Sequence, residues 1–372
     1  MDRAVELAKN GEGRVAPNPP VGCVLVRDGA VVGEGWHDRC GDLHAEAMAI
    51  RAAGGKAQGA TVYVTLSPCT AWGRQPPCVE ALADAGVAEV VAAVRDPNPR
   101  NAGGIERLRE LSVPTRVGLR AEEAEYVARG FFKRARSGTA YVTLKYAMTL
   151  DGKIATPSGD SRWVSGGESR ELVHDLRSRS DAILIGVGAA LADDPLLTVR
   201  GEALARRGGP ERHPQPKRVV LDSDARTPPT AKMLVSPGGR VIIVTCVPTE
   251  HPRARALADA GADILPTPRD GMGKVFLPDA LRALSRMGVN SVLCEGGSGV
   301  AAALLRERMV DEVLAFIAPK LLGSGLSPVG DAGLTRMNQA LPVAVRECVP
   351  VGSDILIRGV LAFETEGTSA KG

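Results

Sequence analysis

Four side chains near the start of the chain have the types and spacing of a metal-dependent catalytic site. His44 and Glu46 lie in the stretch "LHAEA", and Cys69 and Cys78 stand at the two ends of "CTAWGRQPPC". Zinc binds nitrogen and sulfur ligands in a tetrahedral shell, and a catalytic site leaves the fourth position to water. We therefore expect His44, Cys69 and Cys78 to bind one zinc ion per chain, with Glu46 close to the water but not a ligand.

The chemistry of such a site is metal-assisted hydrolysis. Zinc lowers the pKa of its water towards neutrality, and a neighbouring carboxylate moves the protons. His-x-Glu followed by Pro-Cys and a second cysteine is the pattern of zinc deaminases that act on nucleobases. Here eight residues rather than two separate Cys69 from Cys78. The pattern predicts hydrolytic removal of an amino group, with Glu46 as the acid and base.

Other interpretations of the cysteines stay open. A closed structural zinc site would need a fourth protein ligand, and Cys40 is the near candidate. A chance grouping of the three ligands is the other alternative. Free cysteines are usually small buried hydrophobes, and this is our expectation for the remaining five, which are Cys23, Cys40, Cys246, Cys294 and Cys348.

The elements around these residues predict an α/β domain. Apolar runs on both sides of Asp28-Gly29 indicate a β-hairpin, because this pair tolerates a tight turn. An alanine-rich helix should begin at His44, and another at Cys78. Strands at 60–66 and 88–94 precede and follow the second helix. Strands that alternate with helices favour parallel pairing, which would bring the helix starts together at one edge of the sheet.

The second half of the chain predicts another α/β domain. Residues 121–138 should form a helix and a Gly-terminated connection, so we place the boundary between residues 137 and 138. The stretch 200–217 is rich in Gly, Pro and Arg and is expected to be a loop. The predicted strands are 140–150, 182–187, 217–223, 240–245, 291–297, 311–318 and 355–363.

Composition excludes several classes of partner. The 372 residues carry 46 basic and 43 acidic side chains, and only 3% of residues are aromatic, which argues against nucleic acid. No apolar run reaches the roughly 18 residues of a membrane span, so no membrane partner is expected. Seven scattered cysteines do not form a disulfide framework, and the opening stretch lacks a secretory signal. A cytoplasmic location is the expectation.

The chain resembles a known family over nearly its whole length. "APNPPVGCVLVRDG", "GEGWHDRCGDLHAEAMA" and "RDPNP" resemble the first half of the bifunctional deaminase/reductases of riboflavin biosynthesis, the RibD type. "LKYAMTLDGKIA", "LRSRSDAILIGVGAALADDPLLTVR" and "CEGGSGVAAALL" resemble the second half. The resemblance covers residues 2–361 and implies a cytidine-deaminase-like three-layer domain followed by a dihydrofolate-reductase-like α/β domain.

The resemblance also implies a two-step reaction. The first domain would remove the ring amino group of 2,5-diamino-6-ribosylamino-4(3H)-pyrimidinone 5′-phosphate, and the second would reduce the ribosyl group to ribityl with NADPH. By motif position, His44, Cys69 and Cys78 would bind zinc and Glu46 would be catalytic. The residues that would contact the substrate of the deaminase are Asn18, His37, Arg74, Asp96 and Asn98.

For the reductase, the resemblance implies two sets of contacts. Arg177 and Arg200 would suit a phosphate, because guanidinium binds phosphate bidentately, and Ser161, Leu197 and Glu295 would complete the substrate site. Lys145 and Asp151 flank the same motif strand and have no role that the sequence defines. The residues that would contact NADPH are Ala147, Trp163, Asp193, Ser223, Gly297, Ser298, Gly299, Val300, Ala301, Ala302 and Ala303.

Glycines in two stretches need separate interpretation. "GVGAAL" (186–191) is too incomplete for a dinucleotide fingerprint, so we predict no Rossmann domain. The glycines at 296–299 precede a predicted helix, where bare backbone N–H groups suit a phosphate. A simple strand-to-helix turn is the alternative for this second stretch.

The chain departs from the family pattern at two positions beside Cys69. Ser67 replaces a glutamate and Ala71 replaces a histidine. Neither is an expected zinc ligand, but both flank the site. The alternatives are therefore a paralogue that acts on a related pyrimidine, and a reductase whose zinc domain is only a scaffold. A nucleic-acid base deaminase is a third hypothesis, which the charge and aromatic content disfavour. A homo-oligomer is expected.

Overall fold

The computed structural model describes residues 1–72, 76–209 and 213–361 of the chain. It divides into two compact units. The first comprises Met1–Ala140 together with Gly288–Asn290, and the second comprises Tyr141–Met287 and the residues from Ser291 on. The domain boundary between residues 137 and 138 stays a prediction.

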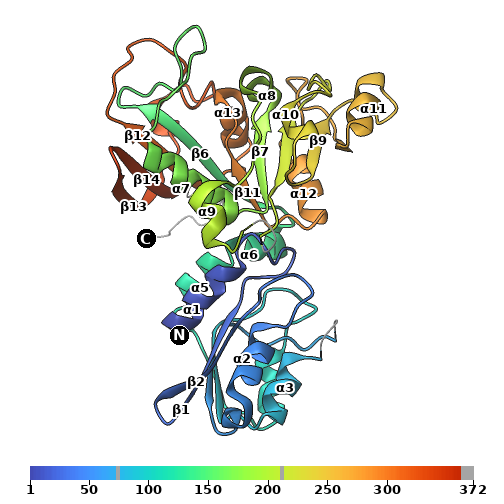
Figure 1. The fold of residues 1–372 in the computed structure, drawn as a ribbon, viewed down its shortest axis with the longest axis vertical. Helices are drawn as coiled ribbons and strands as arrows, with labels where there is room; N and C mark the ends of the chain where they lie inside the picture. Colours follow the sequence, from blue (N-terminus) through green and yellow to red (C-terminus); the bar gives the residue numbers. More distant parts are fainter. Residues whose placement is uncertain (73–75, 210–212, 362–372) are drawn as a thin grey trace, which may run out of the picture. The chain divides into compact units, whose positions relative to one another are not determined.

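The first unit is built on a mixed sheet with the strand order β2-β1-β3-β4-β5 (Figure 1). The predicted hairpin joins β1 to β2, and Asp28 and Gly29 both have positive φ at its turn. β1 also pairs antiparallel with β3, whereas β3, β4 and β5 are parallel to one another. The strands are β1 (Gly22–Arg27), β2 (Ala30–Trp36), β3 (Thr61–Leu66), β4 (Glu89–Val94) and β5 (Thr115–Val117).

Helices cover both faces of this sheet and make three layers. One layer consists of α2, which packs on β1 and β2, and of α3 and α4, which lie next to it in that order. The other layer contains α1 and α5, which contact the sheet through a separate set of buried residues. Alanines on α2 face glycines on β2, so the helix lies very close to the strand. The helices are α1 (Asp2–Ala8), the 3-10 turns η1 (Lys9–Gly11) and η2 (Gly54–Ala57), α2 (Ala45–Ala53), α3 (Cys78–Asp84), α4 (Gly104–Glu110), α5 (Ala121–Val127) and α6 (Arg129–Ser137).

In the second unit the described strands form one sheet in the order β10-β9-β8-β7-β11-β6-β12-β14-β13. The strands from β10 to β12 are parallel, and β14 and β13 are antiparallel additions at one side. The strands are β6 (Tyr141–Thr149), β7 (Ala182–Gly186), β8 (Lys217–Leu221), β9 (Val241–Thr245), β10 (Asp263–Pro266), β11 (Ser291–Cys294), β12 (Glu312–Ala318), β13 (Val343–Val351) and β14 (Asp354–Leu361).

Helices follow most of the parallel strands of this unit, as Figure 1 shows for α8 after β7 and α13 after β11. The carboxyl ends of parallel strands share one edge, so the loops that leave β6, β7 and β11 lie near one another. The helices are α7 (Gly167–Ser178), α8 (Val187–Asp193), α9 (Gly201–Arg206), α10 (Lys232–Val235), α11 (Pro252–Asp259), α12 (Leu277–Arg286), α13 (Ser298–Arg306) and the 3-10 turn η3 (Met337–Gln339).

Three sequence-based expectations about local structure were incomplete or wrong. The stretch 200–217 contains α9 rather than only loop, and its helix start is held because the Glu171 carboxylate accepts a hydrogen bond from the Ala203 N–H at 2.8 Å. The short strands β5 and β10 and the mostly exposed strand β13 were not predicted. Cys40 and Cys348 are exposed, so the expectation of burial was wrong for these two, whereas Cys23 and Cys294 are buried.

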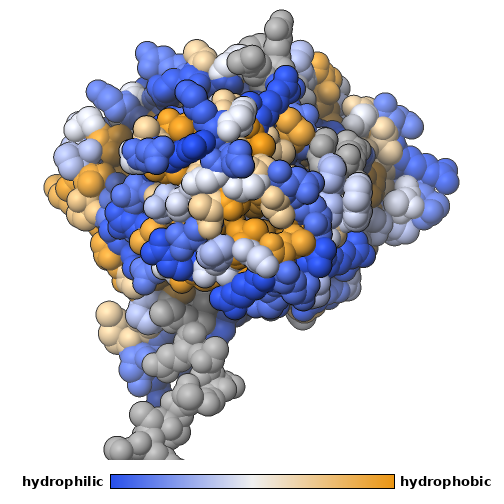
Figure 2. Space-filling model, turned by 90° about the horizontal axis from the view of Figure 1, so that it is seen from below, coloured by the Kyte–Doolittle hydropathy of each residue, from blue (hydrophilic) through white to orange (hydrophobic). Residues whose placement is uncertain are grey.

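In the part of the chain that the structure describes, no helix combines the length and the apolar character needed to cross a membrane. The face seen in Figure 2 mixes hydrophilic side chains with separate apolar areas that they enclose. Singly exposed apolar side chains are normal on protein surfaces, so these areas alone assign no partner.

Candidate functional site

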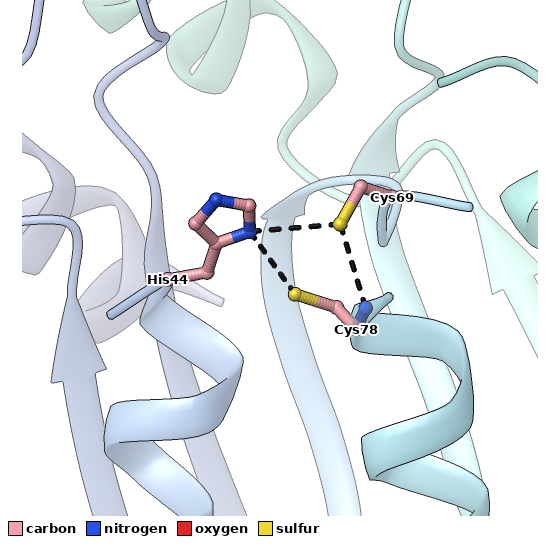
Figure 3. Close-up of side chains that lie close together, drawn as sticks. All are labelled: His44, Cys69 and Cys78. Carbon is pink, nitrogen blue, oxygen red and sulfur yellow. Dashed lines mark hydrogen bonds between the residues drawn. The ribbon is translucent and has the colours of Figure 1, made fainter. Parts of the chain in front are cut away.

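The three expected zinc ligands come together at one point of the first unit. His44 is the residue before α2, Cys69 lies in the loop after β3, and Cys78 is the first residue of α3. Their ligand atoms all lie within 4.8 Å of one another, and Figure 3 shows the three side chains pointing towards a common centre. The His44 Nδ1 atom is 3.2 Å from the Cys78 Sγ atom and 3.5 Å from the Cys69 Sγ atom.

The electrostatics of the two thiols favour a bound cation. The Cys69 sulfur accepts hydrogen bonds from Cys78, including its backbone N–H at 3.4 Å, and these bonds lower the pKa of Cys69 to about 4. The pKa of Cys78 is raised well above its ordinary value by its contact with Cys69 and by burial. Two adjacent thiolates repel each other unless a cation lies between them. One imidazole and two thiolates form a donor set that suits zinc.

Glu46 lies in the first turn of α2, two residues after His44. Its side chain is buried, and burial first, then the negative charge of Cys69, raise its pKa to about 7. A carboxylic acid with a pKa near neutrality can both accept and return a proton at physiological pH. No described residue adds a fourth metal ligand within this group, since Cys40 is exposed and does not belong to it.

Asn18 and His37 form a hydrogen-bonded pair beside the cluster. The His37 Nδ1 atom is 3.1 Å from the Leu43 carbonyl oxygen, which can only accept, so Nδ1 carries the proton. Burial lowers the pKa of His37 and favours the neutral ring. Nε2 is then an acceptor, and the Asn18 amide N–H donates to it at 3.0 Å. The His37 ring also lies edge-on to His44, with the ring centroids 5.4 Å apart.

Asp96 and Asn98 lie in the loop after β4. The Asp96 side chain is buried, which raises its pKa, and its carboxylate accepts a hydrogen bond from the Asn98 N–H at 2.8 Å. Ser67 is buried at the end of β3 and contacts the same loop. Ala71 is half-buried beyond Cys69, and Arg74 lies outside the described residues.

Several expected substrate residues of the reductase also converge. Arg177 on α7 and Glu295 after β11 form a bidentate ion pair, with distances of 2.6 and 2.9 Å, and both side chains are largely buried. The Arg177 guanidinium also donates to the Thr198 carbonyl oxygen at 3.1 Å, next to Leu197. Burial lowers the pKa of Lys145. The negative charge of Glu295 acts in the opposite direction, and the positive charge of Arg177 lowers this pKa further. Leu144 is paired with Cys294, so Lys145 within β6 lies beside Glu295, the residue that follows β11.

The expected NADPH residues lie on several elements of the second unit. Gly297 is the residue before α13, and Val300 packs so close to Gly186 that a Cβ atom there would meet it at 2.6 Å. Ala301 and Ala302 are buried in α13, whereas Ala303 and Ser298 are half-buried and Gly299 is exposed.

The remaining expected residues are more dispersed. Ala147 is on β6, Asp193 is the last residue of α8, and the Ser223 hydroxyl after β8 accepts a hydrogen bond from the Val275 N–H at 3.1 Å. Trp163 is exposed with the Arg170 guanidinium 4.6 Å from its ring centroid, and Ser161 is half-buried in the same loop. Arg200 is the exposed residue before α9.

One further residue of the second unit, His174, emerges only from the structure, and Asp151, which the sequence left without a role, acquires one. His174 lies one turn before Arg177 on α7, and its buried Nδ1 atom has no hydrogen-bond partner among the described residues. Burial lowers its pKa, as do the charges of Arg177 and Arg200. The Asp151 carboxylate accepts hydrogen bonds from the Thr149 hydroxyl and from the Leu322 and Gly323 N–H groups, which lower its pKa to about 2. Asp151 therefore holds the loop that contains Leu322 and Gly323, and we call it a loop anchor.

The comparisons with known proteins agree with both halves. Residues 1–94 match the family model of the cytidine and deoxycytidylate deaminase zinc-binding region, and residues 140–357 match that of the RibD C-terminal domain. The riboflavin biosynthesis protein RibD of Escherichia coli is 41% identical, covering 96% of this chain and 97% of its own, and that of Aquifex aeolicus is 39% identical over 96% of both.

Solved structures give the same result. RibD of Acinetobacter baumannii superposes with a TM-score of 0.87 at 38% identity, covering 98% of both chains. A Thermotoga maritima diaminohydroxyphosphoribosylaminopyrimidine deaminase/5-amino-6-(5-phosphoribosylamino)uracil reductase has a TM-score of 0.84 at 34% identity, covering 97% of both. The expected three-layer deaminase fold and reductase fold are confirmed.

Fold and site together define a two-domain enzyme in which a zinc-dependent deaminase precedes an NADPH-dependent reductase. The chain belongs to the RibD family, the bifunctional deaminase/reductases of riboflavin biosynthesis. This likeness spans both domains and does not favour the alternative of a paralogue that acts mainly as a reductase.

Proposed function

We propose that residues 1–137 deaminate 2,5-diamino-6-ribosylamino-4(3H)-pyrimidinone 5′-phosphate and that residues 138–372 reduce the ribosyl group of the product to ribityl. The observation that carries the first step is the convergence of His44, Cys69 and Cys78 beside the buried Glu46. The second step is supported by the buried pair that Glu295, at the carboxyl end of β11, forms with Arg177 on α7.

His44, Cys69 and Cys78 would hold the zinc ion in this proposal. Bound zinc supplies a Lewis acid that lowers the pKa of a water molecule. Three protein ligands leave a coordination position for that water, which a fourth cysteine would close. The exposed Cys40 is not in the cluster, and this supports a catalytic rather than a structural site.

Glu46 would transfer the protons of the deamination. Its carboxylate takes a proton from the attacking water and delivers a proton to the departing amino nitrogen, so ammonia leaves as a neutral molecule. The buried position favours this role, because burial raises the pKa of Glu46 and so helps the carboxyl group to hold the proton between the two transfers. His44 is the residue before α2, and Glu46 lies in the first turn of this helix, so one element carries both groups.

Polar residues around the cluster would orient the pyrimidine. The Asn18 amide donates to His37 through its nitrogen, so the amide oxygen is the atom that can accept from a ring N–H or amino group. Asp96 and Asn98 would bind other polar atoms of the ring and ribose. Arg74 is proposed as the partner of the phosphate on the resemblance alone, since it lies outside the described residues.

For the reductase, NADPH supplies the hydride when it is bound. The segment Gly297–Ala303 would contact the cofactor, and a phosphate would bind at the first N–H groups of α13, those of Ser298 and Gly299, because helix starts offer unpaired N–H groups. The other proposed cofactor contacts are Ala147, Trp163, Asp193 and Ser223.

The reductase substrate would lie against Arg177, Arg200, Glu295, Leu197 and Ser161. The Arg177–Glu295 pair is rigid because two guanidinium nitrogens donate to the two carboxylate oxygens and the third donates to the Thr198 carbonyl oxygen. His174 and Lys145 adjoin this pair, and we assign them to the substrate side of the site as polar groups that would bind the phosphorylated sugar.

The protein is further proposed to be a cytoplasmic homo-oligomer. β13 is the last strand of the sheet in the described part of the chain, most of its residues are exposed, and Val343 and Val345 are apolar. An exposed apolar edge strand is a common pairing surface between copies. Analytical ultracentrifugation of the whole chain would show a monomer if this proposal is wrong.

The experiment that tests the central proposal is Glu46→Gln. The amide keeps the shape of the side chain but cannot accept the proton, so ammonia release should fall by roughly 10² to 10⁴-fold. Zinc content by metal analysis and NADPH oxidation with the deaminated substrate should stay at the wild-type level. Full ammonia release by this variant would disprove the assignment of Glu46.

A further inference from the structure

Ser67 lies at the start of the loop that carries the proposed zinc ligand Cys69. It directly follows β3 and precedes Cys69 by two residues, and its side chain is buried. Its backbone N–H donates to the Val94 carbonyl oxygen at 2.8 Å, which continues the β3–β4 ladder by one residue. Its hydroxyl oxygen accepts a hydrogen bond from the Asp96 N–H, also at 2.8 Å.

The Ser67 hydroxyl holds the start of the loop after β4, and the Asn98 carbonyl oxygen, which accepts from the Asn101 and Ala102 N–H groups, holds a later part of the same loop. The chain leaves the sheet at Asp96, and the Asp96 carboxylate then accepts from the Asn98 N–H at 2.8 Å. The Asn98 side-chain oxygen in turn accepts from the Arg100 N–H at 3.1 Å. Each step orients the next polar residue, so the positions of Asp96 and Asn98 depend on the bond that Ser67 accepts.

The position is also one where this chain departs from its family, with serine in place of glutamate. A serine hydroxyl is short and neutral, and it satisfies a buried N–H that an alanine would leave without a partner. We propose that Ser67 is a positioning residue of the deaminase, which fixes Asp96 and Asn98 against the pyrimidine substrate through the Asp96 backbone. This inference rests on the proposed function of the two loop residues.

The strand offers a matched control in Thr65. Its hydroxyl oxygen, two residues earlier on the same side of β3, accepts a hydrogen bond from the Gly22 N–H at 3.1 Å. Thr65 is equally buried, but its bond ties β3 to β1 and does not involve the loop after β4. Thr65→Val removes the same kind of hydrogen bond with little change of volume and therefore measures the effect of such a loss away from the loop after β4.

The experiment compares Ser67→Ala, Ser67→Thr and Thr65→Val, with ammonia release from 2,5-diamino-6-ribosylamino-4(3H)-pyrimidinone 5′-phosphate as the assay. Ser67→Ala should raise the KM about tenfold, the value of one buried hydrogen bond, and change kcat less. Ser67→Thr keeps the hydroxyl and should restore the KM to within about threefold. Zinc content and NADPH oxidation should stay at the wild-type level in all three variants.

Several outcomes would overturn the inference. A wild-type KM in Ser67→Ala, or an equal rise in Thr65→Val, would leave Ser67 a structural residue only. Loss of zinc from Ser67→Ala would show that the effect passes through Cys69 and not through the loop. If the wild-type chain itself released no ammonia, the proposed function would fail first, and that result is distinct from a change confined to the Ser67 variants.

Discussion

The contact between α2 and β2 makes Gly35 a residue on which the deaminase site depends. A Cβ atom at Gly35 would lie 2.3 Å from the Ala45 carbonyl oxygen and 2.5 Å from the Ala49 nitrogen. Both atoms belong to the backbone of α2, so no side chain can turn away to make room. Gly35→Ala must therefore move the helix away from the strand.

The size of the movement follows from these distances. Ordinary van der Waals contact begins at 3.4 Å, so the helix must shift by about 1 Å, a displacement that can cost a catalytic site on the order of 10²-fold in rate. His44 and Glu46 stand at the start of this helix and would move with it. Overpacking of this kind also lowers the free energy of unfolding by about 1–3 kcal/mol.

The assay measures ammonia release and NADPH oxidation on the same preparation of Gly35→Ala. We expect the kcat/KM of the deaminase to fall about 100-fold and the reductase rate to stay near the wild-type value. Gly55→Ala is the matched control, because nothing lies within 4 Å of a Cβ atom there. A Gly35→Ala variant with the wild-type deaminase rate would refute the argument that close packing of α2 positions the site.

Three more perturbations have defined outcomes. Arg177→Ala leaves Glu295 buried without its partner and should abolish NADPH oxidation and lower the free energy of unfolding of the second unit by about 3–5 kcal/mol, measured by urea unfolding. Burial raises the pKa of Glu295, but the charge of Arg177 more than offsets this effect, so the pKa is lowered in the folded protein. The pair therefore stabilises the fold at pH values above the ordinary glutamate pKa. Lowering the pH through the pKa of Glu295 should reduce the free energy of unfolding of the wild type by this contribution, and no such loss should occur in Arg177→Ala. Asp151→Ala should speed amide hydrogen exchange at Leu322 and Gly323, seen by mass spectrometry, and unchanged exchange would contradict the loop-anchor assignment. A chelator that removes zinc should stop ammonia release and leave NADPH oxidation intact, and loss of both activities would argue against separate sites.

The convergence of the zinc ligands was predictable because the residues stand at recognisable boundaries of elements. His44 precedes an alanine-rich helix, and Cys78 follows a proline pair at the start of another. Parallel strands bring such helix starts to the same edge of a sheet. The residue types then point to zinc, which accepts histidine nitrogen and cysteine sulfur as ligands.

Other features depend on contacts that no local pattern reveals. α9 forms in a stretch of glycine and arginine because Glu171, on another helix, accepts a hydrogen bond at its start. β13 contains Pro350 and is exposed, which makes its pattern weak, and an edge strand tolerates both features. The hydrogen bond from Asp96 to Ser67 joins two loops that are distant in the chain, so the departure at Ser67 could be noticed but not explained from the sequence.

The position of β11 has a consequence for how the protein is made. β6 ends at Thr149 and β7 at Gly186, yet the strand between them, β11, begins only at Ser291. Until the ribosome has delivered that strand, the facing edges of β6 and β7 carry open backbone groups that can pair with other chains. Contacts between segments so distant in the chain also form slowly. The reductase half should therefore be the slower and more aggregation-prone half of the nascent chain, whereas the sheet of the first unit is complete by Val117.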